Sequence, residues 1–268
     1  LIGFAFVPLI LACAYAVFDG TTEKRDRARA FFLVLLGCLL AVFAQPNLVF
    51  SVFALFIPYG AYRVWNVVSD HATSHVRLLQ FCGMGAFFVI IIVVWAFCLN
   101  ASFMQSVVNF DWPALSTIPQ AFVDTLFVCS SLTPISPVLA LFLVIGIVGT
   151  FKERNHLWIT VLFIFVTIMY VACVATNGSL DRILTGFWYT DRFRISALLA
   201  IVQTLLIAFG LAKTYSFIRK RKNYKRPIWI ALTVVLFVLL LFPSFALRGL
   251  TIVDTPFGHL RHELHSLY

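Results

Sequence analysis

The chain alternates long apolar stretches with short polar breaks, and this alternation is its strongest structural signal. A membrane-spanning helix needs about 20 mostly apolar residues. The pattern predicts eight spans, at residues 1–18, 30–44, 47–66, 79–98, 136–151, 157–175, 193–217 and 228–246. We therefore expect an all-α, polytopic bundle of transmembrane helices, with a transmembrane domain over residues 1–250 and an external tail over 251–268.

The longest break between spans runs from Asn100 to Pro137 and carries a short helical signal of its own. Pro119 suits the first turn of a helix, where its missing N–H costs nothing. The apolar residues that follow would share one face of that helix: Ala121, Phe122, Leu126 and Phe127. We expect an external helix that is interfacial or re-entrant at the outer leaflet.

Composition places the chain in the membrane class. It is 62% hydrophobic and 12% charged, whereas a soluble domain has about 25% charged residues. The mean hydropathy is +0.98. The length alone would allow two soluble domains, but these values exclude them.

Lys and Arg concentrate in every second break. The breaks after the first, third, fifth and seventh spans hold fifteen of the 20 basic residues, and the positive-inside rule assigns that side to the cytoplasm. We therefore expect a multi-pass protein of the plasma membrane with both ends of this chain extracytoplasmic. The run Arg219–Arg226 should contact anionic lipids, and the net charge of +9 then gives no reason to expect nucleic acid.

The chain begins at Leu1, already inside an apolar run and without a basic leader. We therefore expect it to be a piece of a longer protein, with further residues upstream. The six cysteines and six histidines show no set of ligands with metal-site spacing, so the sequence predicts no metal-binding residue.

The segment from Asp181 to Arg194, DRILTGFWYTDRFR, is the strongest candidate for chemistry. It joins the sixth and seventh spans on the outer side, where the seventh helix begins. Thr190 or Asp191 can cap that helix, and its free N–H groups favour an anion. Arg192 and Arg194 add two positive charges suited to a phosphate.

A structural alternative stays open for the same segment. Asp191 and Arg194 are three residues apart, which is the spacing of an ion pair on one helix. Arg192 would then extend to lipid headgroups, while Trp188 and Tyr189 would be ordinary aromatic anchors at the membrane interface.

Three further external carboxylates enter as candidates. Asp111, Asp124 and Asp181 could each act as a general base, although single loop carboxylates are more often helix caps or solvated charges. Asp124 interrupts an apolar helix face, and Asp181 is followed directly by Arg182.

Four sequence pieces together resemble a known group of proteins: AQPNLVFSVF, VVNFDW, QAFVDTL and FWYTDRFRISALL. They are similar to a family of uncharacterised, largely actinobacterial multispanning membrane proteins. That family in turn resembles the GT-C glycosyltransferases, which use polyprenyl-phosphate donors. The most specific piece is the aromatic-x-Asp-x-x-Arg motif, from Tyr189 to Arg194 in this chain.

The resemblance implies a membrane glycosyltransferase of GT-C type that assembles cell-envelope glycans at the extracytoplasmic face. It implies a donor-phosphate site formed by Arg192 and Arg194, with Asp191 orienting them beside Trp188 and Tyr189. The catalytic carboxylate of GT-C enzymes usually lies nearer the N-terminus than Asp111 does. Asp111 is therefore assigned to that role more weakly than the two arginines are to the phosphate. A divalent cation, Mg²⁺ or Mn²⁺, could bind the donor phosphate.

Two other function classes stay open. A flippase-like transporter of lipids or glycans would need a wide polar cavity across the bilayer. A non-catalytic membrane scaffold would lack a pocket at Asp191–Arg194. The sequence thus leaves enzyme and non-enzyme roles both possible.

Overall fold

A computed structural model of the chain describes residues 4, 6–18, 23–71, 75–110, 112–130 and 135–219. This part is all-helical and contains no strand. The α-helices, with three short 3₁₀ segments (η2 to η4) between them, are α1 (Val7–Phe18), α2 (Lys24–Ala44), α3 (Leu48–His71), α4 (Val76–Asn100), η2 (Ser102–Met104), α5 (Gln105–Val108), α6 (Ile118–Leu126), α7 (Pro137–Lys152), η3 (Arg154–His156), α8 (Leu157–Ala175), α9 (Ser179–Thr185), η4 (Gly186–Trp188) and α10 (Arg192–Arg219).

Seven of the eight expected spans coincide with apolar helices of the described part. Five of them, α2, α3, α4, α8 and α10, are long and apolar enough to cross a membrane, whereas α1 and α7 are shorter. The expected span at 228–246, the basic run beyond Arg219 and the tail at 251–268 lie outside the described residues. The fold is therefore a membrane-type helical bundle with five candidate spans in its described part.

Two of the expected boundaries are wrong, and in both cases the helix is longer. α2 begins at Lys24 rather than at residue 30, because its charged first turns are stabilised locally, for example by the Arg29–Asp26 ion pair at 3.1 Å. α3 continues to His71, beyond the expected end of the span at residue 66.

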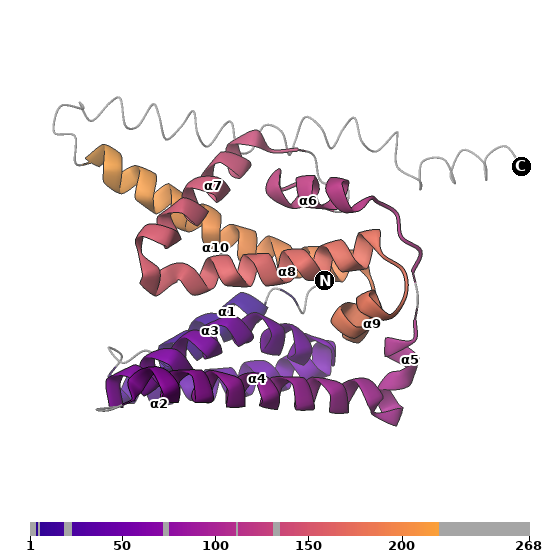
Figure 1. Cartoon of the computed structure of the whole chain (residues 1–268), viewed down its shortest axis with the longest axis horizontal. Helices are drawn as coiled ribbons and strands as arrows, with labels where there is room; N and C mark the ends of the chain where they lie inside the picture. Colours follow the sequence, from indigo (N-terminus) through magenta and orange to yellow (C-terminus); the bar gives the residue numbers. More distant parts are fainter. Residues whose placement is uncertain are drawn as a thin grey trace, which may run out of the picture.

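The helices form two groups that meet at α8 (Figure 1). α1 to α4 pack together in one group, while α7, α8 and α10 form the other, with α6 packed on α8. α3 packs against α8 and joins the groups. α8 accordingly contributes the largest set of buried residues, which extends from Ile159 to Val174.

The α7–α10 crossing depends on two glycines. A Cβ atom on Gly146 would collide with the carbonyl oxygen of Leu206, and one on Gly210 with that of Phe142. Small residues let two membrane helices approach closely enough for backbone-to-backbone packing. This crossing fixes α10, and therefore the position of its first turn.

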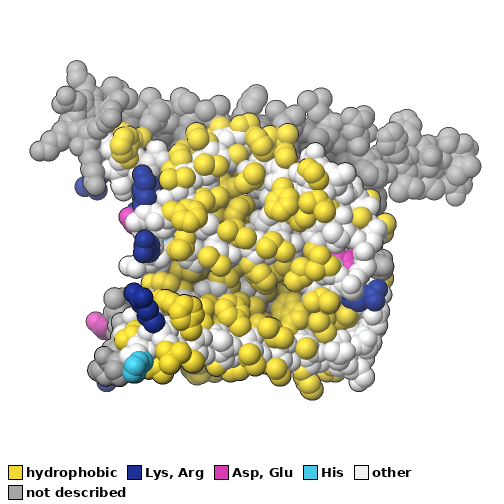
Figure 2. Space-filling view, viewed as in Figure 1, with side chains coloured by type: hydrophobic (Ala, Val, Ile, Leu, Met, Phe, Trp, Pro, Cys, Tyr) yellow, Lys and Arg dark blue, Asp and Glu magenta, His cyan; other side chains and the backbone are white. Residues whose placement is uncertain are grey.

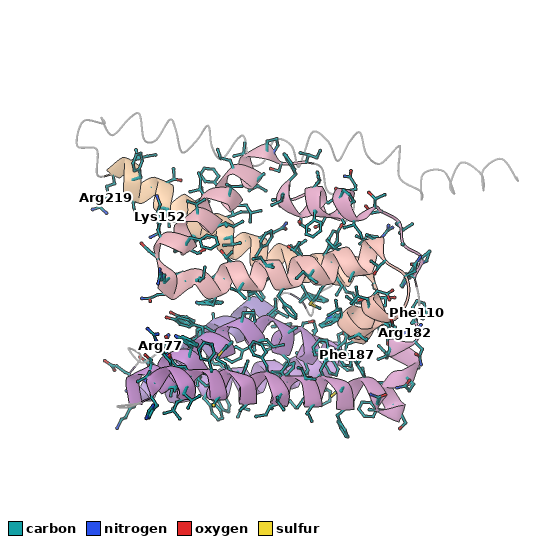
Figure 3. All side chains as sticks on the ribbon, in the orientation of Figure 1. Arg77, Phe110, Lys152, Arg182, Phe187 and Arg219 are labelled. Carbon is teal, nitrogen blue, oxygen red and sulfur yellow. The ribbon has the colours of Figure 1, made fainter. Side chains whose placement is uncertain are left out.

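The charges separate along the long axis of the helices. Figure 3 shows Arg77, Lys152 and Arg219 at one end of the bundle and Arg182 at the other. The face in Figure 2 carries its Lys and Arg side chains at these edges, with an apolar surface between them. We call these the basic end and the opposite end.

At the basic end, Glu153 connects two helices of the second group. Its carboxylate pairs with the Lys213 ammonium of α10 and lies 3.7 Å from His156 Nδ1. The hydrogen bond from Lys213 lowers the pKa of Glu153 below its ordinary value. The pair holds α10 against the α7–α8 connection.

The short helix predicted between Asn100 and Pro137 is present as α6. α6 contains Pro119 in its first turn, and Thr117 Oγ1 accepts a hydrogen bond from Gln120 N at 3.4 Å. The residues that α6 buries are Ala121 and Thr125. The large residues predicted for its apolar face, Phe122, Leu126 and Phe127, are each more than 40% exposed.

Candidate functional site

The turn between α9 and α10 is held in an unusual backbone conformation. Tyr189 and Thr190 both have positive φ angles, 62° and 48°, which a β-branched threonine rarely adopts. Such strain persists only where the surroundings impose it, and it clusters at functional sites.

Thr190 is fixed by contacts from two other parts of the chain. Its hydroxyl donates to the Phe110 carbonyl at 3.0 Å and accepts from Trp112 N at 3.3 Å. Its own carbonyl accepts from the Cys173 thiol at 3.1 Å. Phe110 and Trp112 are thereby brought beside the start of α10, although they are about 80 residues away in sequence. Asp111 itself lies outside the described residues.

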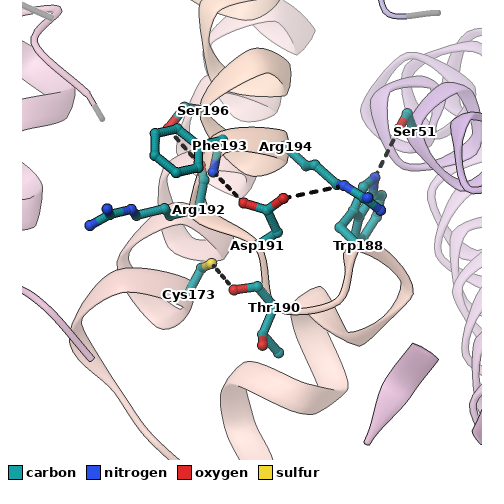
Figure 4. A network of polar contacts seen from close by, with 9 residues as sticks. All are labelled: Ser51, Cys173, Trp188, Thr190, Asp191, Arg192, Phe193, Arg194 and Ser196. Carbon is teal, nitrogen blue, oxygen red and sulfur yellow. Dashed lines mark hydrogen bonds and ion pairs between the residues drawn. The ribbon is translucent and has the colours of Figure 1, made fainter. Parts of the chain in front are cut away.

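Asp191, one of the two residues expected to cap α10, does cap it. Its Oδ1 accepts from Phe193 N at 2.9 Å, and its Oδ2 lies 3.3 Å from Arg194 Nε (Figure 4). The Arg194 guanidinium also lies over the Tyr189 ring, 4.5 Å from its centroid. The structural alternative for this pair, an ion pair at i,i+3, is therefore what the chain adopts.

The two arginines do not form one site. Figure 4 shows Arg192 and Arg194 extending in opposite directions. The reason is helix geometry, because residues two apart are about 200° around the axis from each other. Arg192 lies over the Phe193 ring at 4.8 Å and lines a pocket, whereas Arg194 is engaged by Asp191 and Tyr189.

Trp188 does not anchor the membrane interface. It is fully buried, and its indole N–H donates to Ser51 Oγ at 2.8 Å. Phe187 beside it is also fully buried and stacks on Phe50, with ring centroids 4.1 Å apart. Trp188 therefore cannot touch a donor phosphate, and its role is to lock the opposite end of α3 to η4.

A small pocket of about 60 Å³ opens beside the first turn of α10. It is lined by side chains from the 112–115 segment, the end of α8 and the turn into α10: Trp112, Pro113, Leu115, Cys173, Val174, Thr190, Asp191, Arg192 and Phe193. Its size suits a small polar group and not a hydrocarbon chain.

Asp181, which the sequence left as a possible loop charge, is a buried carboxylate. It is only 1% exposed, and its Oδ1 accepts from Arg182 N at 2.7 Å. The Cys173 thiol lies within electrostatic range of Asp181, Asp191 and Arg192. The signal was present, because Asp181, Thr185 and Trp188 are spaced i, i+4 and i+7, which is one buried helical face. We call Cys173, Asp181, Asp191 and Arg192 the polar cluster.

Asp124 is occupied by local contacts. Its Oδ1 accepts from Gln120 Nε2 at 2.7 Å, and the Cys129 thiol lies 3.6 Å away. Burial first, and then the Asp124 charge, raise the pKa of Cys129 to about 11. Asp124 thus stabilises the end of α6.

The described residues contain no group of three or more His, Cys, Asp or Glu side chains that could hold a metal ion. The polar cluster has two carboxylates and a neighbouring cation, which is a poor donor set for Mg²⁺.

A much larger cavity, a groove of about 980 Å³, separates the two helical groups and contributes to the hollow on the apolar face in Figure 2. It is lined by α3, α4, η3, α8 and α9, from Asn66 and Arg154 at the basic end to Asn100 and Leu184 at the opposite end. Most of its other lining side chains are apolar or aromatic.

The groove and the small pocket open on different sides of α8. The groove contacts Trp158, Val161 and Phe165, whereas the pocket contacts Val174. Phe165 and Val174 are nine residues apart, or two and a half helical turns, so they face opposite directions. One ligand could not place its chain in this groove and its phosphate in this pocket by a direct path.

A family model described as a family of unknown function, DUF6541, matches residues 1–262. No curated protein and no solved structure matches the chain.

Proposed function

This chain belongs to the DUF6541 family, and we propose that it is a glycosyltransferase-like membrane protein that uses a polyprenyl-phosphate-linked sugar. The donor phosphate binds beside Arg192 at the opposite end, which faces away from the cytoplasm of a plasma membrane. The observation that carries the proposal is the pocket beside the strained turn into α10, which Cys173, Asp191 and Arg192 line together.

Arg192 has the chemistry for the leaving group. Negative charge develops on the phosphate as the glycosidic bond breaks, and a preorganised guanidinium stabilises it. Asp191 already accepts the N–H of Phe193 and pairs with Arg194. We therefore assign Asp191 and Arg194 to positioning the turn, and not to binding the donor.

The reaction also requires a base. The acceptor hydroxyl gives its proton to a carboxylate as its oxygen attacks C1 of the sugar, the C1–O bond to phosphate breaks, and polyprenyl phosphate leaves. Two carboxylates compete for this role. Asp181 is buried within the polar cluster, and Asp111 is bracketed by Phe110 and Trp112, which both hydrogen-bond to Thr190.

The test measures donor binding and sugar transfer by the full-length protein in reconstituted membranes. Arg192→Gln should weaken donor binding and slow transfer about 10²-fold, the usual cost of losing one charge-stabilising donor. Asp181→Asn and Asp111→Asn should separate the two candidate bases, since only the base variant loses transfer while keeping donor binding. Arg182→Gln is the matched control, because Arg182 is at the same end but does not line the pocket. Unchanged binding and transfer in Arg192→Gln would refute the proposal.

A lipid transporter is the second candidate, and the groove favours it because its lining extends from the basic end to the opposite end. Vesicles carrying the protein and a headgroup-labelled lipid provide the test. Faster exchange of the label between leaflets, lost when the groove is blocked by Ala96→Trp, would support transport over glycosyl transfer.

A further inference from the structure

We propose that the groove between the two helical groups binds an anionic phospholipid from the leaflet at the basic end. The lipid phosphate lies at Arg154, and an acyl chain extends along the groove between α3, α4 and α8. This site is separate from the polar cluster and independent of the proposed glycosyl transfer.

The dimensions of the groove fit a hydrocarbon chain. On α4 it is lined from Met84 to Asn100, which at 1.5 Å per residue is about 24 Å along the membrane normal. The hydrocarbon core of a bilayer is about 30 Å thick. The groove volume of about 980 Å³ is at the upper end of the range for ligand pockets. The groove therefore offers an acyl chain a continuous path past the centre of the bilayer.

The groove lining explains why a chain, and not a headgroup, would occupy its length. Three tryptophans line it from three different helices: Trp65, Trp95 and Trp158. The Trp95 indole N–H is already bonded to the Ile183 carbonyl at 2.8 Å. Between its two mouths the groove therefore presents hydrocarbon and ring faces, which stabilise an apolar chain by burial.

Charge sets the direction of the lipid. Arg154 lines the mouth at the basic end and is exposed, and no hydrogen bond or ion pair joins its guanidinium to another described residue. Glu153 beside it is engaged by Lys213 and His156 instead. No Asp or Glu is among the described residues that line the groove. A phosphate at this mouth would meet an available guanidinium and no opposing carboxylate.

The mouth at the opposite end lacks this charge. The polar side chain there is Asn100, whose amide already donates to the Ala96 carbonyl at 2.7 Å. Asn66 and Asn155 add two further amides at the Arg154 mouth. The polarity of the groove is therefore asymmetric, and it selects a headgroup from the basic end.

The experiment compares retention of phosphatidylglycerol and phosphatidylcholine with identical acyl chains. The full-length protein is purified in detergent, incubated with each lipid and weighed by native mass spectrometry. We expect about a fivefold preference for phosphatidylglycerol, the effect of one arginine near a lipid surface. Arg154→Gln should abolish the preference, and because Arg154 is exposed this variant should fold normally.

Two controls complete the design. Lys152→Gln removes a neighbouring charge that does not line the groove and should keep the preference. Ala96→Trp fills the groove and should lose both lipids while the protein keeps its elution volume. An unchanged preference in Arg154→Gln overturns the proposal, as does retention of polyprenyl phosphate in place of phosphatidylglycerol, or a dimer that excludes lipid. Donor binding at Arg192 should be unaffected by Arg154→Gln, so the two proposals fail separately.

Discussion

The hydrogen bond from Trp188 to Ser51 joins parts of the chain that are 137 residues apart, at 2.8 Å and with both residues fully buried. It connects α3 of the first helical group to the turn that precedes α10. Removing this contact should loosen the opposite end of the molecule without touching the polar cluster directly.

The size of the effect follows from what each change leaves behind. Ser51→Ala leaves a buried indole N–H without a partner, which costs about 1–3 kcal/mol. Trp188→Phe loses the same hydrogen bond and leaves a small void. Because the bond is lost only once, the two changes should not add. The coupling between them should be about 0.6 kcal/mol, the average for hydrogen bonds between membrane helices, and at most about 1.7 kcal/mol.

A double-mutant cycle measures that coupling. The four proteins are unfolded in mixed micelles of rising denaturing-detergent fraction, with helix content as the signal. Trp95→Phe serves as a matched control, since its indole bonds to a backbone carbonyl and not to Ser51. If the Ser51 and Trp188 changes add to within about 0.3 kcal/mol, they are independent and the hydrogen bond contributes nothing.

Three further predictions concern stability. Gly210→Leu should abolish the folded protein in a thermal-aggregation assay, because a side chain at this position collides with a backbone carbonyl. Gly85→Ala is the control, since a side chain there meets open space, and it should be neutral or stabilising by up to about 1 kcal/mol. Normal folding of Gly210→Leu would contradict the close crossing of α7 and α10. Arg194→Ala should lower the melting temperature through loss of its carboxylate and ring contacts, and no change would mean that those contacts are not formed. The Lys213 hydrogen bond lowers the folded-state pKa of Glu153, so the Glu153–Lys213 pair stabilises the fold fully above the unfolded pKa of about 4.3. This stabilisation is lost as the pH falls through the lower folded-state pKa. Glu153→Gln should therefore flatten the loss of stability in that acid range, and an unaltered pH profile would be the contrary result.

The helices that can span a membrane follow from local sequence. Apolar length and the position of charges locate α4, α8 and α10 closely, and Asp191 is recognisable as a cap because capping needs only its own helix start. These features depend on residues within one or two turns of each other. They are the part of the fold that one sequence can specify.

The candidate site depended on contacts that sequence spacing does not reveal. Trp188 is of a residue type that is common at membrane interfaces, but Ser51, on a helix distant in sequence, accepts a hydrogen bond from its buried indole N–H. Arg192 and Arg194 are close in sequence and yet diverge, because positions i and i+2 lie on different faces of a helix. The groove requires α3, α4 and α8 to meet, and no single stretch carries that information.

The central claim is that the pocket beside Arg192 receives the donor phosphate, and photocrosslinking tests it most directly. A polyprenyl-phosphate sugar with its photoreactive group next to the phosphate is bound to the full-length protein, irradiated and mapped by peptide mass spectrometry. Labelling should fall on the peptides at residues 112–115 and 189–193 and should be reduced in Arg192→Gln. Labelling confined to the groove mouth at Arg154, or unaffected by that substitution, would contradict this claim.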